Sequence, residues 1–189
     1  KDAGLPWLFL EAFLLMGAFV TLFNYIGYRL LAEPYHMDQA FVGLLSVVYL
    51  SGIYSSAKIG SLADRLGRRK VLWGTIVLML AGLAVTMLSP LPLVILGMLI
   101  FTFGFFGAHS VASSWIGRRA TKAKGQASSL YLFSYYAGSS IAGTAGGVFW
   151  HIGGWNGIGL FIGGLLLVAL LVALKLAKLP PLPQGSQTI

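Results

Sequence analysis

The 189-residue sequence contains no cysteine and few charged residues. Without cysteine, the redox environment of the protein cannot be read from its sequence. Only 10% of the residues are charged and 57% are hydrophobic, whereas a soluble domain carries about 25% charged residues. A soluble domain of this size needs more polar surface, so the composition indicates a membrane protein.

The sequence also lacks the alternation of polar and apolar residues that a membrane β-barrel requires. The run from Leu165 to Leu174 is apolar throughout, and a helix that crosses a bilayer needs about 20 such residues. We therefore predict an all-α membrane domain over residues 1–178, followed by a disordered cytoplasmic tail, 179–189. The six expected spans are 6–31, 41–60, 71–89, 93–116, 126–150 and 156–177.

No initiator methionine or signal-peptide cleavage site precedes the first span, which leaves open that the chain is part of a longer protein. The net charge of +8 would suggest nucleic acid for a soluble protein. Here the positive charges have a topological explanation, because nearly all of them fall on one side of the predicted bilayer, which is then cytoplasmic. Both termini are expected on that side, and no nucleic-acid partner is expected. These residues are Lys1, Arg65, Arg68, Arg69, Lys70, Arg118, Arg119, Lys122, Lys124, Lys175 and Lys178.

Polar residues are distributed unevenly among the six spans. The third and sixth spans are almost uniformly apolar and are expected to face lipid, whereas the other four carry most of the polar groups. The spans thus form two triplets of similar polarity that start on opposite sides of the membrane, which predicts a 3+3 inverted repeat. In the fifth span, small residues form two adjacent stripes, Gly138, Ala142 and Gly146 beside Ser139, Gly143 and Gly147. This is more than one close helix contact needs and suggests a helix that slides or rocks.

The connection expected at 61–70 contains a dense charged motif, Gly60-x-Leu62-Ala63-Asp64-Arg65-x-Gly67-Arg68-Arg69. This motif resembles the cytoplasmic signature of the major facilitator superfamily. The resemblance covers the whole chain and implies one six-helix half of a twelve-helix transporter, with the other half as its partner.

We favour the C-terminal half, because the fifth span lacks the Gly-Pro pair that antiporters carry in the N-terminal half. The stretch from Thr21 to Arg29 also resembles the seventh helix of bacterial drug and sugar efflux proteins. The resemblance implies alternating access, proton-coupled efflux of a small organic solute, and a bacterial inner membrane.

The motif match assigns roles to five residues, Gly60, Asp64, Arg65, Gly67 and Arg68. The two glycines permit a sharp turn and close backbone contact. Asp64 inherits contact with a helix N-terminus of the opposite half, which stabilises one conformation by about 0.3–1 kcal/mol. The positive-inside rule explains Arg69 and Lys70 but gives an aspartate no role.

Several polar and aromatic residues are candidates for a substrate cavity, although interhelical hydrogen bonding would explain them equally well. Thr21, Asn24, Tyr25 and Tyr28 share one helix face by their spacing. A stripe on the fifth span suits an amphipathic or cationic solute, or a sugar. The predicted cavity residues are Asn24, Tyr25, Tyr28, Tyr49, His109, Tyr131 and Tyr135.

Two ionisable residues are candidate proton sites. His109 lies near the middle of the fourth span, where an ionisable group is by default a functional hypothesis. A neutral histidine bonded to a nearby hydroxyl is the alternative. Glu11 lies about one turn inside the first span, and we expect it to be wet and interfacial, with Lys58 as one conceivable partner.

Two other classes of function remain as alternatives. The chain could be a self-contained six-helix protein that acts as a homodimer or a structural partner. An intramembrane enzyme is disfavoured, because the sequence shows no metal-ligand cluster and no Gly-x-Ser-x-Gly elbow. No cofactor is therefore expected.

Overall fold

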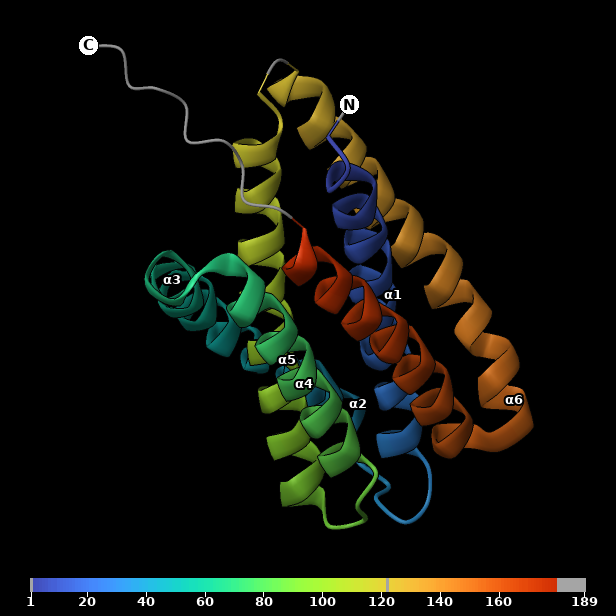
Figure 1. Ribbon diagram of the computed structural model, residues 1–189. Helices are drawn as coiled ribbons and strands as arrows, with labels where there is room; N and C mark the ends of the chain where they lie inside the picture. The colour runs from blue at the N-terminus through green and yellow to red at the C-terminus, as the bar shows by residue number, and fades with distance from the viewer. Residues whose placement is uncertain (1, 122, 180–189) are drawn as a thin grey trace.

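The computed structural model describes residues 2–121 and 123–179, and each regular element in this part of the chain is helical (Figure 1). The prediction of an all-α protein is confirmed. Five helices are long and apolar enough to cross a membrane, with α2, η1 and α3 counted as one. From residue 180 onward, the tail expected to be disordered lies outside the described residues. The elements are α1 (Leu5–Leu31), α2 (Gln39–Leu44), η1 (Leu45–Val48), α3 (Tyr49–Leu66), α4 (Arg68–Thr86), α5 (Leu91–Arg119) and α6 (Lys124–Lys178).

Helix α6 covers both of the last two expected spans. Its 55 residues would extend about 80 Å as a straight helix, far more than the roughly 30 Å of a bilayer core. Gly153 and Gly154 interrupt it, and Gly154 has a φ of +54° that glycine adopts without steric cost. The chain turns back there (Figure 1), and Phe149 stacks on Phe161 across the turn with ring centroids 4.3 Å apart. We call residues 124–152 and 155–178 the first and second arms of α6.

Helix α5 lies at the centre of the bundle and contacts α1, α3, α4 and α6. Its large side chains Phe101 and Phe105 are almost completely buried. Helix α3 lies at the edge of the bundle (Figure 1), and only 17% of the most apolar stretch of Gln39–Leu66, the segment formed by α2, η1 and α3, is buried. The described residues therefore leave a long face of α3 without a protein partner.

Small residues allow α1 and the first arm of α6 to approach closely. A Cβ atom at Gly138 would lie 2.1 Å from the carbonyl oxygen of Phe13, and one at Gly17 would lie 2.8 Å from Ala142. Glycines of the second stripe also face α1, since Gly143 lies against Val20 and Asn24. The two stripes thus form one broad interface, and their width does not by itself indicate a sliding helix.

Arg29 links several segments at the end of the bundle where the α1–α2 and α4–α5 connections lie. Its guanidinium donates hydrogen bonds to the carbonyl oxygens of Thr86 and Leu88 and to the hydroxyl of Tyr35. Trp155 of the second arm also donates to the Thr86 carbonyl oxygen, at 3.2 Å. Arg29 therefore binds the C-terminal carbonyls of α4, where a positive charge is favoured by the helix dipole.

The opposite end is joined by other charged residues. Arg119 donates to Asp2 at 2.6 Å, Arg69 donates to the carbonyl oxygen of Ala177 near the end of α6, and Lys175 lies 3.7 Å from the ring centroid of Trp7. Arg69 thus has a structural contact as well as the topological role expected from the sequence.

The α1–α6 interface predicts a difference between two glycine-to-alanine substitutions. Gly138→Ala should lower the thermal unfolding midpoint of the purified protein, because overpacking costs about 1–3 kcal/mol. Gly164→Ala is the matched control in the same helix, since a Cβ there meets no atom within 4 Å. Equal midpoints for the two variants would contradict the close contact.

Candidate functional site

The charged motif lies at the junction of α3 and α4. The expected connection 61–70 is wrong as a loop, because α3 continues to Leu66 and α4 begins at Arg68. Gly67 alone separates the helices, with a φ of +91° that favours glycine. Gly60 is helical, and its missing side chain lets Ser110 of α5 approach to 3.4 Å from the position of a Cβ. Gly67 therefore makes the turn, whereas Gly60 serves close packing.

Asp64 projects from the last turns of α3 with its side chain 57% exposed. Arg68 donates to it at 2.7 Å and Arg118 of α5 at 3.4 Å. Arg68 also donates to the hydroxyl of Ser114, while Arg65 is exposed. The aspartate is thus held by two arginines of its own bundle and still has an accessible carboxylate.

A cluster around His109 joins α5 to the first arm of α6. The hydroxyl of Tyr131 lies 3.0 Å from Nδ1 of His109, and the ring centroid of Tyr135 lies 4.9 Å from that of the imidazole. Phe105 stacks on the imidazole of His109, with ring centroids 6.1 Å apart. Tyr131 is buried, whereas His109 and Tyr135 are partly exposed. The polar edge of the cluster therefore reaches the surface through His109 and Tyr135.

Tyr49 extends this surface onto α3. Its ring lies 4.9 Å from Phe23 and 5.7 Å from Phe19 of α1, and 6.3 Å from Phe106 of α5, between centroids. Phe19 in turn stacks on Phe105 at 4.0 Å. Contacts between aromatic rings thus run without a break from α3 through α1 and α5 to the first arm of α6.

A second aromatic group lies nearer the Arg29 end, between α1 and α6. The rings of Tyr25, Tyr28 and Trp150 are all about 6 Å apart between centroids. Tyr28 is 59% exposed and Asn24 beside it is also exposed. Thr21, in contrast, is fully buried and bonds to the carbonyl oxygen of Gly17. Of the four residues expected on this face, Thr21 therefore belongs to the helix interface.

The sequence did not predict that Trp150 lies beside Tyr25 and Tyr28. It shares a helical face with Gly143 and Gly147, at positions i, i+4 and i+7. Tyr25 contacts this face, since its hydroxyl donates to the carbonyl oxygen of Gly143 at 3.2 Å. The spacing places Trp150 on the glycine face, but only the packing of α1 shows what meets it.

Glu11 differs most from its predicted environment. The expectation of a wet, interfacial carboxylate is wrong, because Glu11 has no exposed surface. Neither of its carboxylate oxygens has a hydrogen-bond partner among the described residues. Pairing with Lys58 is also absent, since Lys58 is exposed and lies over the ring of Tyr54.

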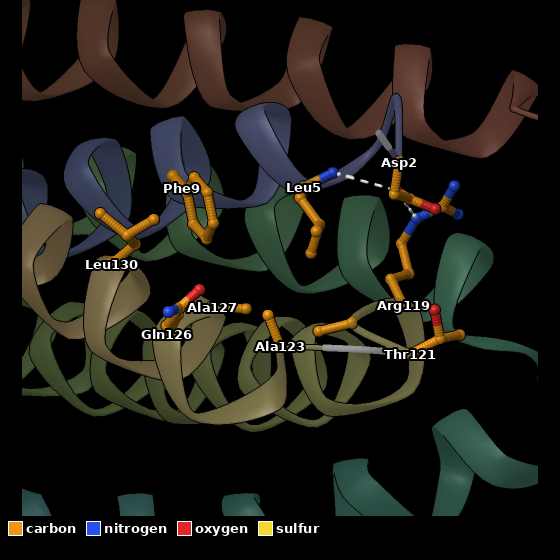
Figure 2. Close-up of a pocket in the computed structure, with 10 residues that line it drawn as sticks. Asp2, Leu5, Phe9, Arg119, Thr121, Ala123, Gln126, Ala127 and Leu130 are labelled. Atoms are coloured by element: carbon orange, nitrogen blue, oxygen red, sulfur yellow. Dashed lines mark hydrogen bonds and ion pairs between the residues drawn. The ribbon is translucent and has the colours of Figure 1, made fainter.

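A hollow of about 340 Å³ opens beside the start of α1, the end of α5 and the start of α6 (Figure 2). Asp2 and Arg119 form its charged corner, and its remaining walls are largely apolar, including Leu5, Phe9 and Leu130. Burial raises the pKa of Asp2, but hydrogen bonds from Arg119 and the backbone N–H groups of Gly4 and Leu5 outweigh this and lower it overall. The hollow is separate from the His109 cluster, since no residue of that cluster lines it.

The part of the chain that the structure describes offers no candidate metal site. Within residues 2–121 and 123–179, no three histidine, aspartate or glutamate side chains come together in a group that could hold an ion. The two aromatic groups described above consist instead of aromatic rings, tyrosine hydroxyls, the amide of Asn24 and the imidazole of His109. Such groups can bind an organic solute by stacking and hydrogen bonding.

Comparison with known proteins gives consistent results. A family model described as Major Facilitator Superfamily matches residues 8–188. The chain is 63% identical over 178 residues to the inner membrane transport protein YnfM of Escherichia coli (strain K12), covering 94% of the chain and 43% of YnfM. It is 50% identical over 183 residues to YybF, an uncharacterized MFS-type transporter of Bacillus subtilis (strain 168), covering 97% and 45%. An uncharacterized transporter of Buchnera aphidicola subsp. Schizaphis graminum (strain Sg) is 49% identical over 178 residues, covering 94% of the chain and 43% of the relative.

The chain thus spans less than half the length of these curated relatives. Their names and the family model describe transport rather than catalysis, and together with the apolar helices they indicate a multi-pass bacterial membrane protein. The resemblance first noted in the Gly60–Arg69 motif is confirmed: the chain belongs to the major facilitator superfamily.

Proposed function

We propose that this chain is the C-terminal half of a transporter that moves a small organic solute by alternating access against an N-terminal half. Its coverage of 43–45% of the relatives' length supports a half rather than a self-contained homodimer. The long uncovered face of α3 also supports this proposal, because a second half would bury it. The inner membrane is proposed as its location, by similarity to the relative from Escherichia coli.

The proposed architecture has six crossings arranged as a 3+3 inverted repeat. The two arms of α6 supply the fifth and sixth crossings, because each is long enough to cross a bilayer core and Gly153 and Gly154 separate them. Both termini are proposed to be cytoplasmic. The charged contacts of Arg68, Arg118 and Arg119 all lie at that end of the helices, as the positive-inside rule requires.

The observation that carries the functional proposal is the aromatic and polar surface built from four helices. Tyr49 of α3, His109 of α5, Tyr135 of α6 and Tyr28 of α1 each have exposed or partly exposed side chains, and the proposal assigns all four to this surface. Such groups are costly against lipid, and they suit a path for a solute with an apolar body and polar or cationic groups. Asn24, Tyr25 and Tyr131 complete the proposed cavity residues.

Transport is proposed to be efflux driven by proton coupling, with His109 and Glu11 as the proton sites. His109 is partly exposed at the proposed cavity, and an imidazole can accept and release a proton. Glu11 has no exposed surface. The two residues are thus proposed as a partly exposed and a buried site for the same ion.

The proposed cavity predicts which introduced cysteines react with a water-soluble thiol reagent in the complete transporter in its membrane. Asn24→Cys and Tyr28→Cys should react at least tenfold faster than Leu160→Cys and Leu171→Cys. The two leucines are 79% and 67% exposed in this bundle, but the proposal covers them with lipid. Similar rates at all four positions, measured in a cysteine-free background, would refute the proposed cavity.

Asp64 is proposed to bridge to the opposite half in one conformation only. Asp64→Asn keeps the shape and removes the charge, so it should shift the ratio of inward-open to outward-open molecules. A contact of about 1 kcal/mol changes this ratio about fivefold. Distances between spin labels on the two outer rims would measure the shift.

Lys70→Gln is the control, because it removes an exposed charge from the same junction. It should leave the distance distribution unchanged. An unchanged distribution and unchanged transport in Asp64→Asn would rule out the bridge and leave Asp64 as a local partner of Arg68 and Arg118.

A further inference from the structure

The hollow between the ends of α1, α5 and α6 combines a buried charge with apolar walls, and the proposed transport path does not use it. Its volume is about 340 Å³, which lies in the lower part of the range for small-molecule sites. Figure 2 shows Asp2, Arg119 and Thr121 at one end of the hollow, and Phe9 and Leu130 at the other. The hollow thus has a polar end and an apolar end.

Arg119 is buried at the polar end but is only partly hydrogen-bonded. Its side chain is 5% exposed and lies against Gly4, where a Cβ atom would collide with the guanidinium. Nε donates to Asp2 at 2.6 Å, and neither terminal nitrogen, Nη1 nor Nη2, has a hydrogen bond to a described residue. Buried donors nearly always have partners, and arginine frequently binds an oxyanion through two N–H groups. The terminal nitrogens are therefore available to a further acceptor.

Asp2 is already engaged by several donors. Its Oδ1 atom accepts from the backbone N–H groups of Gly4 and Leu5, at 2.8 and 3.2 Å, as well as from Nε of Arg119. The carboxylate thus caps the start of α1, which fixes its position beside Nε. Residues 118–130 contain four positively charged residues and no acid, so this end of the hollow favours an anion.

The remaining walls suit a hydrocarbon chain. Leu5 and Phe9 lie one turn apart on α1, and Ala123, Ala127 and Leu130 follow the start of α6 for about 10 Å. The charged pair lies at the helix ends, whereas Phe9 and Leu130 lie one to two turns inside their spans. The polar and apolar parts therefore follow the order of a bilayer, from the interface to the hydrocarbon.

We propose that the hollow binds an anionic amphiphile, with its carboxylate or phosphate head on the terminal nitrogens of Arg119 and its hydrocarbon chain between Phe9 and Leu130. Both kinds of head accept charge-assisted hydrogen bonds from a guanidinium. Thr121 and Gln126 also line the hollow, and their hydroxyl and amide groups can donate to the same head. An amphiphile of this kind is either a free fatty carboxylate or an anionic phospholipid.

The site is tested with photoactivatable lauric acid and the complete transporter in nanodiscs of phosphatidylcholine, whose headgroup has no net charge. Illumination should attach the acid to the peptides that contain Phe9 and Leu130. Photoactivatable lauryl alcohol, which has the same chain and an uncharged head, should label them about tenfold less. Competition by added phosphatidylglycerol identifies a phospholipid as the occupant, and competition by unlabelled laurate but not by phosphatidylglycerol identifies a free carboxylate.

Two substitutions should change labelling by the acid in opposite directions. Arg119→Gln removes the positive charge and should reduce labelling about tenfold. Asp2→Asn keeps an oxygen that can cap α1 and removes the competing negative charge, so it should increase labelling, which a failure to fold would not do. Arg118→Gln is the control, because that side chain is 62% exposed and does not line the hollow, and it should label as the wild type does.

Three results would overturn the inference. Equal labelling by the acid and the alcohol would mean that water satisfies the terminal nitrogens of Arg119. No labelling of either peptide would mean that the other half of the transporter fills the hollow. Labelling of Asp2→Asn at or below the wild-type level would show that the head is not bound as an anion. These results do not depend on the solute or the driving ion proposed for transport.

Discussion

The bilayer core offers no hydrogen-bond partners, and this constraint determines most of the structure. Backbone groups must be satisfied within each segment, so the described spans are helices. Some buried hydroxyls are satisfied in the same way, as when Thr75 and Thr86 bond to carbonyls three residues earlier. Lipid also gives no hydrophobic drive for helices to associate, so close packing must do so. The contacts of Gly138 with α1 and of Gly82 with α5 meet this need.

The same constraint separates the bundle into regions with different chemistry. Charged side chains lie at the two ends, where Arg29 binds the end of α4 and Arg119 binds Asp2. Between these ends, the polar groups are mostly neutral and lie among aromatic rings, which are apolar bodies with polar edges. Glu11 is the exception, as an acidic group buried between the charged end and the aromatic centre. The proposed transport path and the proposed proton sites both follow from this separation.

The sequence predicted the helical class and the location of most helices, because hydropathy over about 20 residues measures what the bilayer selects. It predicted the 61–70 connection wrongly, since a polar stretch does not end a helix unless a residue such as Gly67 breaks it. It could not predict the burial of Glu11, which depends on how α1 packs against α5 and α6. Spacing alone placed Thr21, Asn24 and Tyr28 on one helix face, whereas the burial of Thr21 depends on how it packs against Gly146 of α6. Local patterns thus predicted the elements and motif, and interhelical packing determined which polar groups are accessible.

The central claim is that the surface carrying Tyr28, Tyr49 and Tyr135 faces a second half of the transporter and not lipid. A cryo-electron microscopy structure of the complete transporter in a lipid nanodisc would test it most directly. The account predicts that the second half covers α3 and encloses a water-filled gap beside these tyrosines, with ordered acyl chains against the second arm of α6. Acyl chains packed directly on Tyr28 and Tyr135, or a second copy of this chain covering α3, would contradict it.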